Sequence, residues 1–556
     1  MPVVKVRLDT LARLTGVGNI EVLQNTLFNL KCESEIDEEG NIAIEVQSDR
    51  IDMFSAEGIA KAVRLYLGLD KPSSIELRGI PFKVIVKPPI KRPYIALAAV
   101  TNVNLDEEKL KLLIDFQERL HTTFGRNRRK VAIGLHDLDR LPSPLLEYRD
   151  VDIDQTCMIP LHDFREMSIR KVLEATEQGV LYGSIALNEN MHPAILSEGK
   201  VISLPPVINS DITRLTESTR NILIDVTGTD VNAVNAVLNS IINALAFYGG
   251  EVLGAEIIYP ETSIITPDLK PKVIKVDLKY IFEWLGIERE QVSHIEGALN
   301  RMGHRIISIT EDSIEVEVPY YRNDILHQVD IAEDIAMGIG YENLGFEEVE
   351  PRLRIVKGLS LRALASVIRE ALIGLGYAEL NTLTLVPNQI LEELGFKNYV
   401  MVINAPSNEI NALRSALLQS IIITLKNSQY IPQPVKVFEI GEVVTRCSTC
   451  YNKWKNELRV CWAIMNSETR FEEVHATLYA ILKELELATM LRLRPCDIDM
   501  FSRGRCADVY INDTAIGVLG EINPEKLVKL GIFYPITLAE VSINILYSFL
   551  TGKNVK

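Results

Sequence analysis

The stretch between residues 314 and 340 constrains its own secondary structure more tightly than any other part of the chain. Three apolar residues, Ile314, Val316 and Val318, alternate with glutamates, which is the period of two of a half-buried strand. Pro319 ends this strand because proline has no N–H for a sheet ladder. The next five residues, Tyr-Tyr-Arg-Asn-Asp, form a turn, and we expect a helix to begin near Ile325.

The expected helix has one acidic face. On a helical wheel anchored at Asp324, the carboxylates of Asp330, Glu333 and Asp334 fall within one arc of about 100°. Two interpretations are open. In one, Asp324 caps the helix and the other three acids form a solvated face. In the other, the four carboxylates bind a hard cation such as Mg²⁺, which prefers oxygen ligands. The opposite side is apolar and consists of Ile325, Val329, Ala332, Ile335, Ala336 and Ile339.

Length and composition predict a multidomain globular protein. A chain of 556 residues suggests three or four domains of roughly 150 residues each. Hydrophobic residues make up 47% and charged residues 24%, so several packed cores are expected and disorder is not. The net charge of −16 argues against a large autonomous surface for nucleic acid. A local basic patch or a partner subunit would then make most phosphate contacts.

The sequence also indicates a cytoplasmic location. Its first residues lack the apolar core of a signal peptide, and no apolar run reaches the roughly 20 residues of a membrane span. Seven cysteines, an odd number in a long chain, argue against a disulfide framework and for a reducing compartment. Cys447 and Cys450 have the spacing of a zinc-binding pair, but no second pair follows nearby. We therefore expect reduced cysteines without a structural role.

Pattern changes divide the chain into four regions, and together they predict an α+β fold. Residues 1–80 form a small α+β unit in which Ser55 caps a helix. Residues 81–268 open with a linker-like proline cluster around a short strand at 84–86, and later contain a buried strand at 222–230. Residues 269–350 contain two helices, then the strand and the acidic helix. Residues 351–556 begin with a helical repeat, and a strand-like segment follows Gly376.

The acidic segment resembles a known module. Residues 318–325, 330–336 and 340–342 are similar to the B5 module of phenylalanyl-tRNA synthetase (phenylalanine–tRNA ligase) β subunits. The resemblance implies that Mg²⁺ is bound at Asp324, Asp330, Glu333 and Asp334, in a site shared with the α subunit.

The resemblance extends over the whole chain, in family order. Residues 48–60 resemble the family's N-terminal B1-like module, with Ile51 where the family usually has proline. Residues 132–139 and 204–210 resemble the B3/B4 editing domain of the archaeal/eukaryotic branch. Segments 413–418, 437–443 and 517–524 resemble a class II synthetase domain. The resemblance therefore implies an editing domain, a winged-helix-like B5 module and a catalytic-like domain with an antiparallel sheet.

The fourth region lacks the groups that class II enzymes use to clamp ATP. The stretch that resembles motif 2, residues 438–442, has no arginine before Glu439, and no glycine-rich stretch ending in Glu-Arg follows. Arg414 and the pair Arg503 and Arg505 remain, and salt bridges or subunit contacts explain them as well as phosphate binding does. We expect a scaffold, with aminoacylation and its ATP on the α subunit. The resemblance implies an α2β2 tetramer that binds tRNA(Phe).

The second region is expected to carry hydrolytic chemistry. The resemblance implies hydrolysis of Tyr-tRNA(Phe), because a site for Phe cannot strongly reject Tyr by size alone. Asp225 and Thr227 are candidates to recognise the phenol, although an acid at this point can also cap a turn. Asn209 and Ser210 are candidates to orient the ester or a water molecule.

Two further features of the second region have competing explanations. His136 is more easily explained as a structural hydrogen bonder than as a base. The basic run at residues 126–130 either contacts the tRNA acceptor end or compensates a helix dipole.

Two other functions of the whole chain also remain open: a stand-alone editing hydrolase and a non-catalytic tRNA-binding scaffold.

Overall fold

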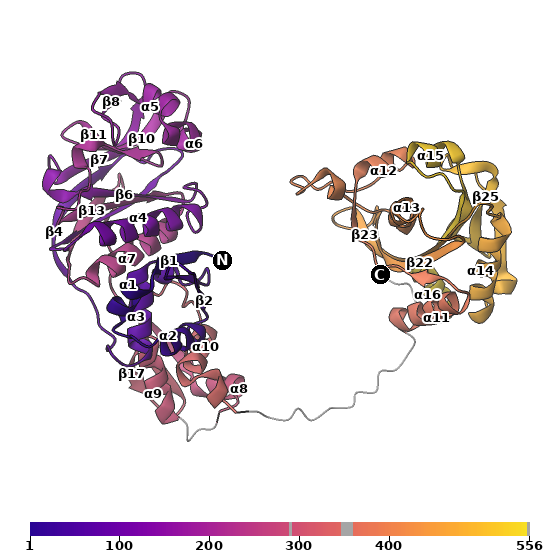
Figure 1. Cartoon of the computed structure of the whole chain (residues 1–556), viewed down its shortest axis with the longest axis horizontal. Coiled ribbons are helices and arrows are strands. Elements are labelled where there is room, and N and C mark those ends of the chain that lie inside the picture. The colour runs from indigo at the N-terminus through magenta and orange to yellow at the C-terminus, as the bar shows by residue number, and fades with distance from the viewer. Residues whose placement is uncertain (288–291, 346–359, 553–556) are drawn as a thin grey trace. The chain divides into compact units, whose positions relative to one another are not determined.

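The computed structural model describes residues 1–287, 292–345 and 360–552. The chain forms two compact units, Met1–Glu350 and Pro351–Lys556 (Figure 1). Each unit combines helices with antiparallel or mixed sheets, so the expected multidomain α+β fold is confirmed. Within these ranges, no helix is long and apolar enough to cross a membrane.

The first unit begins with a small module whose sheet has the order β1-β3-β2. Its helix α3 starts after Ser55, whose hydroxyl accepts a hydrogen bond from the Gly58 N–H at 2.9 Å, as the sequence predicted. The elements are β1 (Val3–Arg7), α1 (Leu8–Thr15), α2 (Ile20–Asn29), β2 (Glu33–Ile36), β3 (Asn41–Glu45), η1 (Ile51–Phe54) and α3 (Ala56–Tyr66).

A ten-stranded sheet follows, with the order β12-β11-β10-β7-β4-β14-β5-β13-β6 and β15 paired to β14. Helices α4 and α7 cover one of its faces (Figure 1). The strands are β4 (Leu77–Val86), β5 (Tyr94–Thr101), β6 (Val131–Asp137), β7 (Leu145–Asp152), β10 (Met191–Ser197), β11 (Lys200–Leu204), β12 (Ile208–Asn209), β13 (Ile222–Gly228), β14 (Glu251–Ile258) and β15 (Ser263–Thr266). The helices are α4 (Glu107–Thr122), α5 (Ile169–Ala175), α6 (Glu177–Ala186) and α7 (Val231–Ala246), and β8 (Cys157–Met158) pairs with β9 (Met167–Ser168).

Strand β4 corrects the expected linker. It starts at Leu77 and contains Pro81, so the predicted boundary at residue 80 falls inside a strand. The register between β4 and β14 shifts beside Pro81, which pairs with no residue of β14. Such an irregularity tolerates a residue without an N–H, and this is why the proline did not end the strand.

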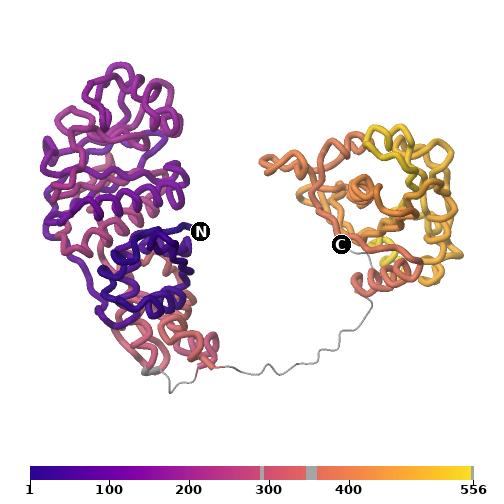
Figure 2. Tube along the Cα trace, viewed as in Figure 1, coloured from indigo at the N-terminus to yellow at the C-terminus, as the bar shows by residue number. Residues whose placement is uncertain are grey.

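The first three predicted regions share one hydrophobic core. Leu27 of the N-terminal module, Val237 of α7 and Tyr320 of the acidic segment all belong to it. Figures 1 and 2 show the indigo N-terminal module between α7 and the helices α9 (Val292–Arg301) and α10 (Gln328–Ile339). The N-terminal module therefore joins the large sheet to the acidic segment.

The acidic segment differs from prediction at its helix start. Helix α10 begins at Gln328, because His327 is its N-cap and Asp330 completes a capping box. The expectation that Asp324 caps this helix is therefore wrong. The strand β18 (Ser313–Val318) alternates between buried and half-buried residues, as predicted. Strand β18 pairs with β16 (Lys272–Asp277) and with β17 (Arg305–Ile309). The sequence did not predict β16. Helix α8 (Leu278–Leu285) packs beside these strands.

The second unit is built on a seven-stranded sheet with the order β19-β22-β23-β27-β26-β25-β24. Two hydrophobic cores include residues of this sheet. One is formed with helix α13 and the other with helices α11, α14 and α16, and the two cores use different residues of the strands. The strands are β19 (Ala378–Glu379), β22 (Val435–Arg446), β23 (Trp454–Met465), β24 (Leu491–Pro495), β25 (Phe501–Ile511), β26 (Thr514–Ile522) and β27 (Ile536–Ser542), with β20 (Leu385–Val386) paired to β21 (Ala412–Leu413) outside the sheet. The helices are α11 (Leu361–Gly374), α12 (Asn388–Glu393), α13 (Leu417–Asn427), α14 (Phe471–Glu484), α15 (Pro524–Lys529) and α16 (Ile543–Thr551). The strand predicted at residues 380–385 is thus mostly irregular, since β19 ends before it and only Leu385 belongs to β20.

The cysteines also depart from expectation. Disulfides join Cys447 to Cys450 and Cys496 to Cys506, with Cα–Cα distances of 5.5 and 5.4 Å. The expectation of reduced cysteines without a structural role is wrong for these four. The antiparallel pairing of β24 with β25 brings residues 496 and 506 together, a register that spacing alone does not reveal.

Candidate functional site

A cavity of about 450 Å³ lies in the second predicted region, beside α4, β6 and β13. Two of the four candidate residues line it: Asn209 and Asp225. The Asn209 amide donates to the Leu135 carbonyl at 3.1 Å and accepts from the Ser203 hydroxyl at 3.1 Å. Its orientation is therefore fixed by the cavity wall.

Asp225 is a buried polar residue in the lining of this cavity. Its Oδ2 accepts a hydrogen bond from His136 Nε2 at 2.7 Å, and its Oδ1 is buried without a partner in the described chain. His136 Nδ1 lies 2.7 Å from the Thr213 hydroxyl. Because Asp225 Oδ2 is the acceptor of this bond, we assign the proton to Nε2, and Thr213 donates to Nδ1. His136 is fully buried behind Asp225 and is not a free base, as the sequence favoured.

Gly134 makes room for the Asp225 carboxylate. The two residues lie directly opposite each other in the β6–β13 pairing. A Cβ atom on Gly134 would lie 1.9 Å from Asp225 Oδ2, well inside van der Waals contact. A glycine in a buried strand is a signal for such a close approach, and sequence reasoning overlooked it here.

The other two candidates do not line the cavity. Ser210 is fully buried, and its hydroxyl donates to the Ile159 carbonyl at 2.9 Å. Thr227 shares a sheet face with Asp225, but its hydroxyl accepts from Arg92 Nε at 2.9 Å. Their predicted direct contact with the ester or phenol is corrected, because both hydroxyls are used within the protein. The lining residues that sequence reasoning missed include His121, Gly134, His162 and Thr213, whereas Arg128 belongs to the basic run that it had named.

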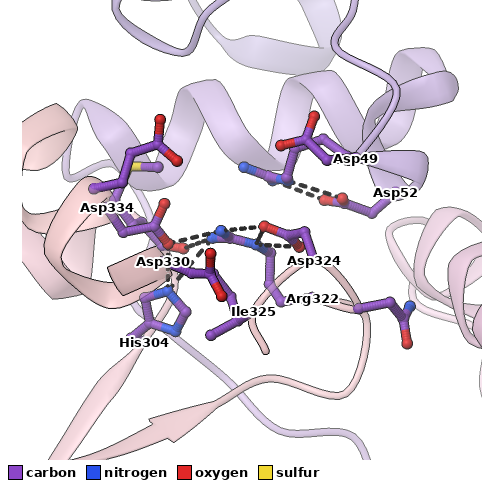
Figure 3. Close-up of polar contacts among 12 residues, drawn as sticks. Asp49, Asp52, His304, Arg322, Asp324, Ile325, Asp330 and Asp334 are labelled. Atoms are coloured by element: carbon purple, nitrogen blue, oxygen red, sulfur yellow. Dashed lines mark hydrogen bonds and ion pairs between the residues drawn. The ribbon is translucent and has the colours of Figure 1, made fainter. Parts of the chain in front are cut away.

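The acidic helix contributes to a second polar site, shown in Figure 3. The Arg322 guanidinium lies between two carboxylates, with Nη2 2.7 Å from both Asp324 Oδ2 and Asp334 Oδ2. Asp334 also accepts from His304 Nε2 at 2.6 Å. Only 1% of the Arg322 side chain and 6% of Asp334 are exposed, so the interpretation as a solvated face fails for Asp334.

The other two acids lie nearer to solvent. Asp330 Oδ2 accepts from the N–H groups of Leu326 and His327, each at 2.8 Å. The Glu333 carboxylate, 48% exposed, pairs at 3.1 Å with Lys31 of the N-terminal module. This cluster therefore links the first and third predicted regions.

The charges in this cluster are strongly coupled. Burial alone would raise the pKa of Asp334, but Arg322 and His304 outweigh it and hold that pKa below its ordinary 3.8. The pKa of Asp324 is lowered in the same way, against its burial and by Arg322. Both carboxylates are therefore ionised in the folded protein.

All four acids border one cavity of about 30 Å³, the size of a single water molecule. Its lining also includes Asp49, Lys31, Arg50 and Arg322, so five carboxylates face three basic groups. Among the described residues, however, no group of three or more His, Cys, Asp or Glu side chains is arranged to hold a metal ion.

Two of the three arginines singled out in the second unit are engaged in salt bridges. Arg414 is buried and pairs with Glu439 at 2.7 Å, and its Nε donates to the Glu442 carbonyl. Arg505 contacts both oxygens of Glu521. The salt-bridge explanation from sequence is therefore correct for these two.

Comparisons with known proteins agree with this architecture. Residues 274–341 match the tRNA synthetase B5 domain, and residues 347–543 match the phenylalanyl-tRNA synthetase β-chain CLM domain. The phenylalanine–tRNA ligase β subunit of Aeropyrum pernix is 39% identical over 558 residues, covering 98% of this chain and 99% of the relative. The chain belongs to the phenylalanine–tRNA ligase β-subunit family. The Saccharolobus solfataricus β subunit is 38% identical, with 95% of both chains covered.

A solved structure resembles the first unit of this family member. An N-terminal fragment of the phenylalanyl-tRNA synthetase β subunit from Pyrococcus horikoshii is 34% identical, with a TM-score of 0.58. The match covers 61% of this chain and all of that fragment.

Proposed function

We propose that the chain is the subunit of phenylalanine–tRNA ligase that does not itself aminoacylate. With an α subunit, which binds ATP, it attaches Phe to tRNA(Phe), and it hydrolyses Tyr-tRNA(Phe) in its own editing site. The near-complete similarity to named β subunits is the observation that carries this proposal. Neither a stand-alone hydrolase nor a pure scaffold is favoured by any contact described above.

The second unit supports the scaffold role. A catalytic arginine must be free to clamp phosphate as charge develops on it. Arg414 is instead buried against Glu439, and Arg505 is paired with Glu521. We therefore place aminoacylation on the α subunit.

Asp225 is the proposed selector for tyrosine. With Oδ2 held by His136, Oδ1 remains to accept a hydrogen bond from a phenol O–H. A charge-assisted bond of this kind contributes about 1.5–3 kcal/mol. Phe in the same place would leave the buried carboxylate oxygen unpaired, so the site favours Tyr over Phe by about 10- to 150-fold.

The remaining residues are proposed to hold this geometry during hydrolysis. Water attacks the ester carbonyl, the ester C–O bond breaks, and a hydroxyl of the tRNA's terminal ribose leaves with a proton. Asn209 lines the cavity with its amide held by Leu135 and Ser203, while Ser210 and Thr227 stabilise the wall through bonds within the protein. The hydroxyls of Ser210 and Thr227 therefore support the cavity wall and do not contact the substrate.

Replacing Asp225 tests the editing assignment. In the assembled enzyme, Asp225→Ala should lower kcat/KM for Tyr-tRNA(Phe) hydrolysis by about 10- to 150-fold. Asp225→Asn should behave similarly, because its amide replaces an acceptor facing the phenol with a donor. Unchanged hydrolysis by both variants would remove Asp225 from the editing site.

We propose Mg²⁺ binding at a narrower site than the four predicted acids suggest. Arg322 already lies between Asp324 and Asp334, so these two do not fit a shared ion. Asp330 and Glu333 have no arginine between them, Glu333 is exposed, and Mg²⁺ is commonly held by one or two carboxylates with several waters. Five carboxylates against three basic groups leave a net charge of −2 around the cavity, which a divalent cation would balance.

The metal proposal is tested by metal content and titration calorimetry with MgCl₂ on the full chain and on the α–β complex. Asp330→Asn combined with Glu333→Gln should abolish Mg²⁺ binding and leave the Arg322 pairs intact. Equal Mg²⁺ binding by wild type and this variant would contradict the proposed ligands.

The assembly and module boundaries complete the proposal. We propose an α2β2 tetramer in the cytoplasm that binds tRNA(Phe). We also propose that the chain contains a B1-like module, a B3/B4 editing domain, a winged-helix-like B5 module and a class II synthetase-like domain without catalytic motifs. The predicted divisions at 268 and 350 stay predictions, and size measurement of the coexpressed complex tests the stoichiometry.

A further inference from the structure

The backbone at residues 126–128 has an unusual conformation beside the cavity. Arg126, Asn127 and Arg128 have φ angles of 53°, 52° and 64°. Three successive residues other than glycine in the left-handed region are strained, and such a turn persists only where its surroundings fix it. We refer to residues 126–128 as the left-handed turn.

Several hydrogen bonds fix this turn between α4 and β6. The Arg128 N–H donates to the His121 carbonyl at 3.0 Å, and the Lys130 N–H donates to the Gly125 carbonyl at 2.8 Å. Buried Arg92 donates to the Arg128 carbonyl at 3.0 Å and uses its other N–H groups on Thr227. Arg92 has no ion-pair partner in the described chain, so its guanidinium is dedicated to backbone and hydroxyl acceptors here.

The side chains of the basic run have different environments. Arg128 forms part of the cavity wall, where it pairs with Glu118 at 2.7 Å and stacks on Tyr182 at 4.3 Å. Lys130 pairs with Asp230 at 3.4 Å. Arg126 and Arg129 are exposed, and neither guanidinium has a hydrogen-bond or ion-pair partner among the described residues.

These two free guanidinium groups belong to residues on either side of Arg128, which lines the cavity, in a chain of net charge −16. Under the proposed function, the ester in that cavity is attached to the 3′-terminal nucleotide, so backbone phosphates must leave through the cavity mouth. Guanidinium groups bind phosphate through two parallel hydrogen bonds. A strained turn that fixes their positions reduces the entropy lost on binding.

We infer that Arg126 and Arg129 bind the phosphates of the last nucleotides of the tRNA and so set how far the ester enters the cavity. Arg128 and Lys130 do not share this role, because their charges are already paired. This inference rests on the proposed editing function.

The test uses the assembled α–β enzyme and two substrates. One is Tyr-tRNA(Phe), and the other is the tyrosyl ester of adenosine, which fits the same site but has no phosphate. The variant is Arg126→Ala/Arg129→Ala, and the control is Arg140→Ala, an exposed arginine past the far end of β6. Because β6 spans seven residues, the control lies about 23 Å away.

The double variant should lose at least about tenfold in kcat/KM for Tyr-tRNA(Phe). The slope of log kcat/KM against log salt should become shallower by about 0.7 per lost phosphate contact, or about 1.4 in total. Hydrolysis of tyrosyl adenosine should keep its wild-type rate, and Arg140→Ala should match wild type on both substrates. Arg126→Lys/Arg129→Lys should retain the salt slope, because it keeps the charges.

Other results would overturn the inference in distinguishable ways. Wild-type rates and salt slope in the double variant would show that the arginines do not bind phosphate. An equal loss on both substrates would show that they shape the cavity instead. A wild-type enzyme that hydrolyses neither ester would remove the proposed editing function, and the inference with it.

Discussion

Arg322→Met removes the guanidinium that pairs directly with both Asp324 and Asp334. Methionine has a similar length, so the main change is the loss of a buried charge. The two carboxylates, 9% and 6% exposed, would then face each other in a site where burial opposes their ionisation.

The size of the effect follows from burial. Removing one partner of a buried ion pair costs about 3–5 kcal/mol, because the other charge stays behind unpaired. The free energy for opening α10 should fall by that amount, which corresponds to about 150- to 4,500-fold more frequent opening. By contrast, Arg305→Met breaks a partly exposed pair with Glu317 in the same module. That change should cost no more than about 1 kcal/mol, or about fivefold.

Amide hydrogen exchange of the full chain, read by mass spectrometry on peptides covering α10, measures this opening. Exchange in α10 should accelerate strongly in Arg322→Met and little in Arg305→Met. If α10 in Arg322→Met exchanges within fivefold of wild type, Arg322 does not hold the acidic cluster together, and the reasoning from its burial is wrong.

Three further predictions concern the editing cavity, acid stability and the disulfides. Gly134→Ala should displace the Asp225 carboxylate and lower Tyr-tRNA(Phe) hydrolysis by at least about tenfold, with Phe aminoacylation by the complex retained; equal hydrolysis rates would count against the close contact. The depressed pKa values of Asp324 and Asp334 mean that their stabilisation is present above about pH 3.8 and is lost as the pH falls below it. The melting temperature should therefore drop steeply below pH 4, and less steeply in Asp334→Asn; parallel curves for the two proteins would argue against this linkage. Cys496→Ser should lower stability by about 2–3 kcal/mol, since the disulfide closes a loop of about ten residues, and calorimetry of wild type in reducing agent should show at least this loss, because Cys447–Cys450 is reduced as well.

Sequence periodicity predicted the local elements well where one face is buried. The alternation at residues 314–318 and the Ser55 cap both depend on neighbouring residues, and the structure has both. The start of α10 was misplaced because two competing acids, Asp324 and Asp330, could each serve the helix N-terminus. The choice depended on Arg322, which takes Asp324 into a buried ion pair.

The candidate site was only partly predictable, for a similar reason. Asp225 was found from its place in a buried strand, and the β6–β13 register then put it opposite Gly134. Thr227 lies two residues further along the same strand and on the same face, but its hydroxyl accepts a hydrogen bond from Arg92, which is 135 positions away in the sequence. Cross-strand partners of this kind, like the pairing of Cys496 with Cys506, follow from tertiary register and leave no local pattern.

Aminoacylation of tRNA(Phe) with Phe and ATP tests the central claim most directly. The reaction should be measured with this chain alone, with its α partner alone, and with the complex. The scaffold role of the second unit predicts that the complex forms Phe-tRNA(Phe) and that this chain alone forms none. Formation of Phe-tRNA(Phe) by this chain alone would contradict the proposed division of labour between the two subunits.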